Sequence, residues 1–71
     1  MRKHEQRTVK WTDSIAYSAW FRPDEKLMPL ECESTGYVFE DTDTHLSLAS
    51  SVGENGQFFN VLVIPKAVIH K

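Results

Sequence analysis

The side chains that can act as metal ligands are few and lie far apart along the chain. The three histidines, His4, His45 and His70, are separated by long stretches of other residues. No ligand spacing of the kind found in metal sites joins them to Asp41 or Asp43. They are interpreted as surface imidazoles, so the sequence predicts no metal site.

The sequence also contains little that supports acid–base or nucleophilic catalysis. Glu31 and Glu33 share a strand face, a spacing that a catalytic carboxylate pair could use, but alternation also places solubilising charges there. Cys32 has no nearby histidine or helix N-terminus to activate its thiol, which is typical of a small core residue. The serines lie in no nucleophile motif, and no Gly-rich phosphate loop occurs. The sequence therefore predicts a protein that is not an enzyme and carries no cofactor.

The aromatic residues of the N-terminal third have two interpretations. Trp11, Tyr17, Trp20 and Phe21 could stack on bases or on another ligand. In a small chain such residues more often form a second core between a helix and a sheet, which is the preferred interpretation. The candidate ligand-binding residues are three of these aromatic residues and one lysine near the end of the sequence, namely Trp11, Tyr17, Trp20 and Lys66.

The chain has 71 residues and is expected to be a single domain over 8–71, preceded by a flexible N-terminus over 1–7. A domain of this size buries only about 60% of its unfolded surface, so its stability is marginal. Cys32 is the only cysteine, which excludes an intrachain disulfide. A well-packed core or self-association must supply the missing stability.

A short helix is predicted before the strands begin. Thr12 or Asp13 is a suitable N-cap, because its side-chain oxygen can accept a backbone N–H of the first turn. The helix is expected to run from about Asp13 to Trp20, and Pro23 ends or redirects it. A helix this short must dock on another element to persist in water.

From Leu30 onward the side-chain types alternate from one residue to the next, and this period of two indicates strands. The alternation changes character at Gly36, and this predicts a bend in the first of these strands. Asn55 and Gly56 predict a hairpin turn before the next strand, over 57–64. A turn at 66–67 then leads to a last short strand over 68–69.

The strand over 57–64 is apolar on both faces, which is typical of a strand covered twice or facing a partner. It lacks the charges that normally protect an exposed edge. A homo-oligomer is therefore expected, and its predicted interface consists of Phe59, Val61, Val63 and Val68.

Two motifs carry a resemblance to the Sm-like fold, a small SH3-type barrel, over about residues 13–70. One pairs a strand glycine with following hydrophobic and acidic positions, here Gly36, Val38, Asp41, Leu46 and Leu48. The other is the turn and last strand over 64–69. The resemblance implies a mainly β, five-stranded barrel with a short N-terminal helix, assembled into rings. Bacterial RNA chaperones of this class carry a lysine–histidine pair in the second motif, whereas here Lys66 is followed by Ala67.

A second resemblance is to small uncharacterised proteins of phages and their hosts. It rests on Val9, Trp11 and Asp13 at alternate positions, a later Trp20, and the closing run over 64–66. It implies a phage accessory protein in the host cytoplasm that binds or sequesters a host factor or a nucleotide signal.

Charge favours a protein ligand or a small molecule over nucleic acid. The net charge is −2, with five basic residues against two acids over 1–22 and eight acids against one lysine over 23–65. An acidic surface of this kind repels the phosphate backbone. No secretory signal or membrane-spanning apolar run occurs, which indicates a cytoplasmic protein. The expected function is a non-enzymatic, homo-oligomeric binding module, and the alternative is an Sm-like nucleic-acid-binding protein.

Overall fold

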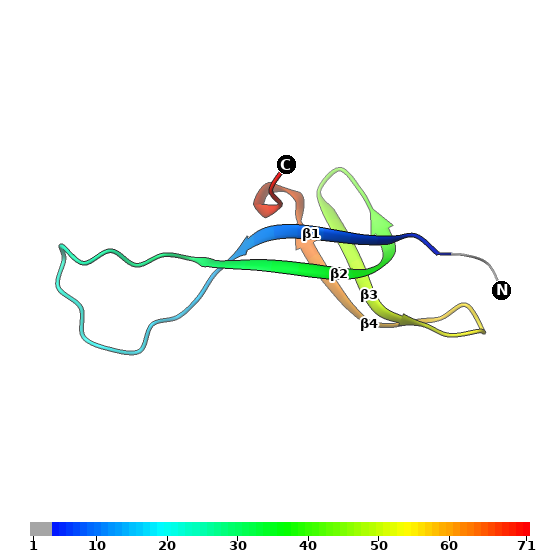
Figure 1. Ribbon diagram of the computed structural model, residues 1–71, viewed down its shortest axis with the longest axis horizontal. Helices are drawn as coiled ribbons and strands as arrows, with labels where there is room; N and C mark the ends of the chain where they lie inside the picture. Colours follow the sequence, from blue (N-terminus) through cyan, green and yellow to red (C-terminus); the bar gives the residue numbers. More distant parts are fainter. Residues whose placement is uncertain (1–3) are drawn as a thin grey trace.

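The computed structural model describes residues 4–71 as one antiparallel sheet followed by a single short 3₁₀ turn. The strands are β1 (Gln6–Asp13), β2 (Leu30–Asp41), β3 (His45–Val52) and β4 (Phe58–Pro65), and the turn is η1 (Lys66–Val68). They pair in the order β1-β2-β3-β4, so each strand lies beside its neighbours in sequence (Figure 1).

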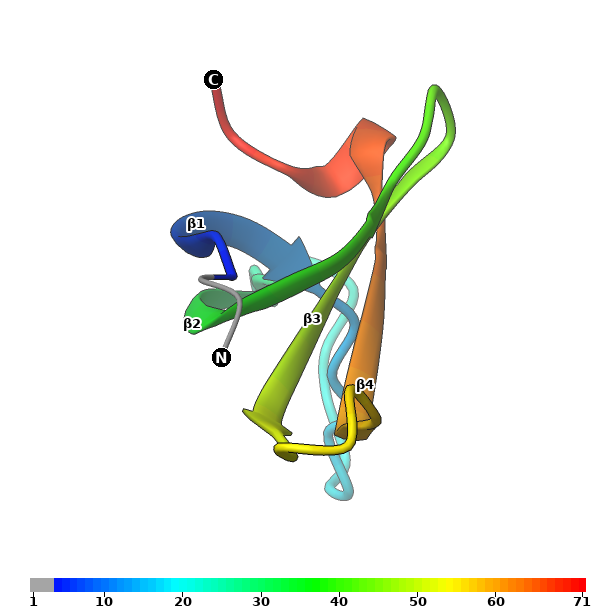
Figure 2. The same cartoon turned by 90° about the vertical axis from the view of Figure 1, so that its right-hand side faces the viewer.

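Strand β2 is long and serves two partners in succession. Its first part pairs with β1, from Asp13 opposite Leu30 to Gln6 opposite Tyr37, and its last part pairs with β3. The register shifts between Val38 and Glu40, which marks a β-bulge at the bend. The β1–β2 ribbon is consequently inclined to the β3–β4 hairpin (Figure 2). The predicted bend in this strand is confirmed.

Gly36 allows the two parts of the sheet to come together at that bend. It is buried, and a Cβ atom built there would lie 2.7 Å from the carbonyl oxygen of Ala49 and 3.0 Å from Cβ of Leu48. Real Cβ atoms do not approach backbone atoms so closely, so only glycine fits between β2 and β3 without a shift of the backbone.

The core is small and lies between the inclined parts of the sheet. Its buried cluster consists of the large aliphatic side chains of Leu46, Leu48 and Ile64, on β3 and β4, and Ala49 of β3 is also buried. Half-buried residues from β1, β2 and the C-terminus pack against them, namely Val9, Trp11, Val38, Val68 and Ile69. The Trp11 indole N–H donates a hydrogen bond of 3.0 Å to the Ser34 hydroxyl, which satisfies its polar atom at the edge of the core.

The predicted hairpin between β3 and β4 is confirmed. The N–H of Gly56 donates to the carbonyl of Gly53 at 2.9 Å, and the N–H of Gly53 donates to the carbonyl of Gln57 at 2.8 Å. Gly56 has a φ of 85°, in the left-handed region where glycine is favoured. Asn55 contributes through its side chain, whose oxygen accepts the N–H of Gln57 at 3.1 Å.

The predicted helix from Asp13 to Trp20 is wrong. Thr12 and Asp13 are the last residues of β1, opposite Glu31 and Leu30, and 14–29 form an irregular loop. The Thr12 hydroxyl donates to the Glu31 carboxylate at 2.8 Å instead of capping a helix. Strand pairing thus uses the expected capping residues, and nothing lies beside the segment on which so short a helix could dock.

The predicted five-stranded barrel of the Sm-like or SH3-like type is also wrong, since the structure is an open sheet of four strands. The segment expected to form the last strand is occupied by η1 and by one antiparallel bridge, between Trp11 and Ile69. Its residues pack onto the core and do not extend the sheet. Of the N-terminal residues expected to be flexible, 1–3 lie outside the described residues, and Gln6 and Arg7 belong to β1.

The molecule is elongated, because the loop over 14–29 projects far from the sheet along the longest axis (Figure 1). The longest dimension is 55 Å, and the radius of gyration is 16.0 Å. A compact chain of this length would have a radius of gyration of about 11 Å. A large part of the chain therefore contributes nothing to the common core.

We expect Gly36→Ala to destabilise the protein by about 1–3 kcal/mol, because the new methyl group forces β2 and β3 apart. Chemical denaturation followed by circular dichroism measures this loss. Ser51→Ala, on the exposed part of β3, is the matched control and is expected to change stability by less than about 0.5 kcal/mol. Equal stability of Gly36→Ala and the wild type would contradict the role assigned to this close approach.

Candidate functional site

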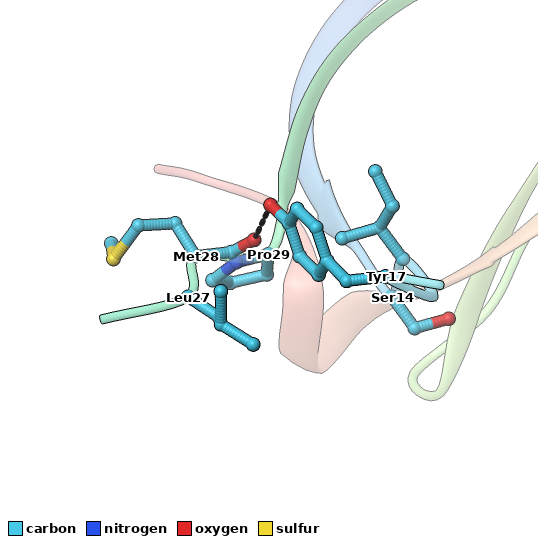
Figure 3. A pocket seen from close by; sticks show the side chains of 6 residues that line it. Ser14, Tyr17, Leu27, Met28 and Pro29 are labelled. Atoms are coloured by element: carbon cyan, nitrogen blue, oxygen red, sulfur yellow. Dashed lines mark hydrogen bonds between the residues drawn. The ribbon is translucent and has the colours of Figure 1, made fainter. Parts of the chain in front are cut away.

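The loop over 14–29, here called the arm, has a defined conformation although it contains no helix or strand. It starts and ends at the last β1–β2 pair, Asp13 opposite Leu30. Further out, the Tyr17 hydroxyl donates a hydrogen bond of 2.8 Å to the carbonyl of Met28, so the Tyr17 ring spans the gap between the two legs (Figure 3). A turn over 22–25 reverses the chain, with the N–H of Glu25 bonded to the carbonyl of Arg22 at 3.1 Å.

The arm exposes more apolar side chain than a free loop usually does. Its exposed large hydrophobic residues are Ile15, Tyr17, Trp20, Phe21, Leu27 and Met28. Trp20 is fully exposed, at 101% of its reference surface. The rings of Tyr17 and Phe21 meet edge to face, with centroids 6.1 Å apart. Long irregular loops in small domains are usually functional, and exposed apolar patches mark sites of interaction.

Between its two legs the arm forms an open cup of about 390 Å³. Its lining consists of Ser14, Ile15, Tyr17, Leu27, Met28 and Pro29. The Tyr17 ring faces Pro29, and the Met28 side chain points away from the ring toward solvent (Figure 3). The cup is thus an apolar hollow whose shape is fixed by the Tyr17–Met28 hydrogen bond.

The four predicted ligand-binding residues do not form one site. Trp11 packs against the core of the sheet, and not in the expected second core between a helix and the sheet. Tyr17 lines the cup, whereas Trp20 is exposed elsewhere on the arm. Lys66 is half-buried, and its ammonium group is bonded to the carboxylate of Asp41 at 2.6 Å. The expectation that Trp20 seals a second core is wrong, because there is no helix for it to seal.

Strand β4 carries the second exposed apolar surface. It pairs with β3 alone among the described residues, so its outer edge is open. Phe59 and Val63 are 70% and 57% exposed, and Val61 is also exposed. Val61 and Val63 lie opposite the buried Ala49 and Ser47 of β3. Three of the four predicted interface residues are therefore on this surface, and the fourth, Val68, packs against the core.

Asn60 interrupts the regular geometry of β4. Its φ of 61° is the one positive value among the described residues other than glycine. Asparagine tolerates this left-handed conformation better than most residues do. The regular part of the open edge consequently runs from Val61 to Pro65, where proline ends the supply of N–H donors.

A cluster of charges joins the two ends of the sheet. The two oxygens of the Asp41 carboxylate bind Lys66 Nζ at 2.6 Å and an Arg7 guanidinium nitrogen at 2.9 Å, and Arg7 also binds Glu5 at 2.6 Å. These contacts link β1, β2 and η1. The hydrogen bonds from Lys66 and then from Arg7 lower the pKa of Asp41 below its ordinary value of 3.8. Lys66 and Arg7 thus hold the fold together.

The histidines lie in three separate places. His4 meets the ring of Phe58 with centroids 5.4 Å apart, and His45 Nε2 lies 2.8 Å from Glu40. His70 Nε2 lies 2.8 Å from the Thr12 hydroxyl and 3.2 Å from Glu31. Over residues 4–71 no three histidine, cysteine or acidic side chains converge on a point where a metal ion could bind.

The cup is not predicted from the sequence, because the residues from Asp13 to Trp20 are expected to form a helix. Leu27, Met28 and Pro29 have no expected role. The sequence does contain a signal for an apolar loop. Apolar residues are frequent between Asp13 and Leu30, but they do not recur with the period of a helix, and the segment contains two prolines. Such a segment is a poor helix and is too apolar for an ordinary solvated loop.

Comparisons with protein-family models, with curated proteins and with solved structures gave no match. No helix long and apolar enough to cross a membrane occurs in the described part of the chain. The arm and the open edge of β4 are the surfaces from which a function has to be inferred.

The charge cluster predicts a pH-dependent stability. The lowered pKa of Asp41 means that its contribution is fully present above the unfolded-state value near 3.8 and is lost as the pH falls through the lower, folded-state value. We expect Asp41→Asn to lower the melting temperature at pH 7, and this difference to shrink as the pH is lowered further and further below 3.8. Asp43→Asn is the control, since Asp43 forms no ion pair within 4–71. A difference that is constant over this pH range would contradict the assignment.

The two tryptophans are expected to respond differently to truncation. Trp11→Ala removes a side chain that packs on the core and is expected to cost about 3 kcal/mol. Trp20→Ala removes a fully exposed side chain, and we expect a change within about 0.5 kcal/mol when unfolding is measured in dilute solution. Denaturant titration of the two variants side by side tests this. A large loss of monomer stability in Trp20→Ala would contradict the exposed position of that ring.

Proposed function

We propose that the protein is a non-enzymatic binding protein that works as an assembly of identical subunits, and that the subunits join along β4. One observation carries this proposal. The chain exposes 6000 Å² of surface, whereas a compact folded chain of this size exposes about 4,500 Å². The excess of about 1,500 Å² is close to twice the area of about 800 Å² that each partner buries in a typical interface.

The open edge of β4 has the features of a strand that pairs with another copy. From Val61 to Ile64 it contains no charged side chain, and Val61, Leu62 and Val63 are all exposed. Edges that stay free are protected by lysines, prolines or covering loops. Here proline comes only at position 65, after the apolar run. Antiparallel pairing of two β4 strands would continue the sheet across a two-fold axis and cover these side chains.

The alternative, an Sm-like nucleic-acid-binding protein, loses support. Two of the cations that it would use, Arg7 and Lys66, are bound to Asp41 and Glu5. Their charge is therefore largely compensated, and phosphate binding depends on uncompensated cations. An origin in a phage and the capture of a host factor or a nucleotide signal stay predictions from the sequence.

The proposal is tested by native mass spectrometry and light scattering at tens of micromolar protein. We expect a homo-oligomer whose subunit number falls in the double variant Val61→Lys/Val63→Lys, because paired strands would bring four lysines together. Gln57→Lys adds a charge in the adjacent hairpin and serves as the control, which is expected to keep the wild-type state. A wild-type protein that stays monomeric over this range would refute the proposal.

A further inference from the structure

The arm combines an exposed aromatic side chain with an apolar hollow. Trp20 extends fully into solvent, and no described residue covers it. The cup lined by Tyr17, Leu27 and Pro29 is open on the same arm, and Trp20 does not line it. We propose that the arms of two copies pair with each other, so that Trp20 of each copy enters the cup of the other. This inference deepens the proposed self-assembly but uses a different surface.

The cup is suited to receive an aromatic ring. Its volume of about 390 Å³ falls within the range of pockets that hold small organic groups, about 300–1,000 Å³. Its walls are the side chains of Ile15, Tyr17, Leu27 and Met28 together with the ring of Pro29. The Met28 side chain is exposed, and the unbranched thioether chain of a methionine can adapt its shape to an incoming ring. A buried tryptophan contributes a large apolar area, about 150–250 Å².

The arm is prepared for this contact before a partner arrives. The Tyr17–Met28 hydrogen bond joins its two legs, and the Arg22–Glu25 turn fixes its reversal. Arg22 also lies 3.7 Å from Asp24 and 3.6 Å from Glu25, which orders the charged side of the turn. Binding therefore orders few additional groups, and a fixed surface loses less entropy on association than a flexible one does.

Symmetry favours a second copy as the occupant. In a two-fold contact each residue i of one copy meets residue j of the other, and j meets i in return. An element that carries both the ring and the hollow satisfies both of them in one such contact. A different partner would have to supply a matching ring and a matching hollow of its own.

Charge points to the same occupant. The arm carries Arg22 and Lys26 against Asp24 and Glu25, so its formal charge is zero. Two arms can therefore approach without net repulsion, and antiparallel arms can place opposite charges near each other. A nucleic acid or an anionic membrane surface would need an excess of cations here, which the arm does not have.

The area supports two contacts and not one. A typical interface buries about 800 Å² on each partner. The excess surface of about 1,500 Å² is close to twice that amount, which matches one contact at β4 and one at the arm. Two different two-fold contacts in one subunit generate a tetramer when they close.

The experiment is native mass spectrometry of four proteins at the same concentration of tens of micromolar. These are the wild type, Trp20→Ala, Val61→Lys/Val63→Lys, and the combination of all three substitutions. We expect a tetramer, a dimer, a dimer and a monomer, in that order. Trp20→Phe keeps a ring for the cup and is the matched control, with the tetramer retained in larger part than in Trp20→Ala. Circular dichroism of each variant verifies that the sheet is intact.

The two proposals fail in different ways. If Trp20→Ala keeps the subunit number of the wild type while the lysine variant halves it, the arm contact is refuted and the β4 contact stands. If Trp20→Ala halves the number and the lysine variant does not, the β4 contact is refuted and the arm contact stands. A wild-type monomer refutes both. Quenching of Trp20 fluorescence by iodide gives an independent reading, since pairing of the arms is expected to protect this ring at high protein concentration and not at low.

Discussion

The close approach of β2 and β3 at Gly36 determines the rest of the structure. Without a side chain at this position, the carbonyl oxygen of Ala49 comes closer than a Cβ atom would allow, and Cβ of Leu48 lies at the limit of a tight contact. Strand β2 can therefore bend between its first part, which pairs with β1, and its last part, which pairs with β3. The bend turns Val9 and Trp11 of β1 toward Leu48 and Ile64, and this makes a core possible in a sheet of only four strands.

A core built in this way covers only the middle of the sheet. Three large aliphatic side chains form the buried cluster, and the C-terminal residues close one side through the Trp11–Ile69 bridge. The Asp41 charge cluster holds that side in place from the surface. The outer edge of β4 and the arm lie beyond the reach of this core. They are exposed because the core does not extend to them, and these are the surfaces at which we propose association.

The sequence predicted those parts of the fold that depend on local chemistry. The bend in β2, the hairpin at Gly56 and the exposed apolar character of Phe59, Val61 and Val63 all follow from side-chain types and spacing. The helix could not be excluded locally, because Thr12 and Asp13 are good capping residues. Their pairing with Glu31 and Leu30 is a long-range contact that overrides the local preference. Likewise, nothing local to Lys66 shows that Asp41 will bind its charge.

The two exposed apolar surfaces, the edge of β4 and the arm, share the property that they carry no net charge. The segment from Pro23 to Pro65 contains eight acids and one lysine, so two copies of it repel each other over most of their surface. The run from Val61 to Ile64 carries no charge, and the arm carries a balanced set. The proposed association is therefore least opposed where apolar area is also largest. In the proposed assembly, contacts at these neutral surfaces avoid the repulsion between acidic surfaces, and this favours a defined orientation of the copies.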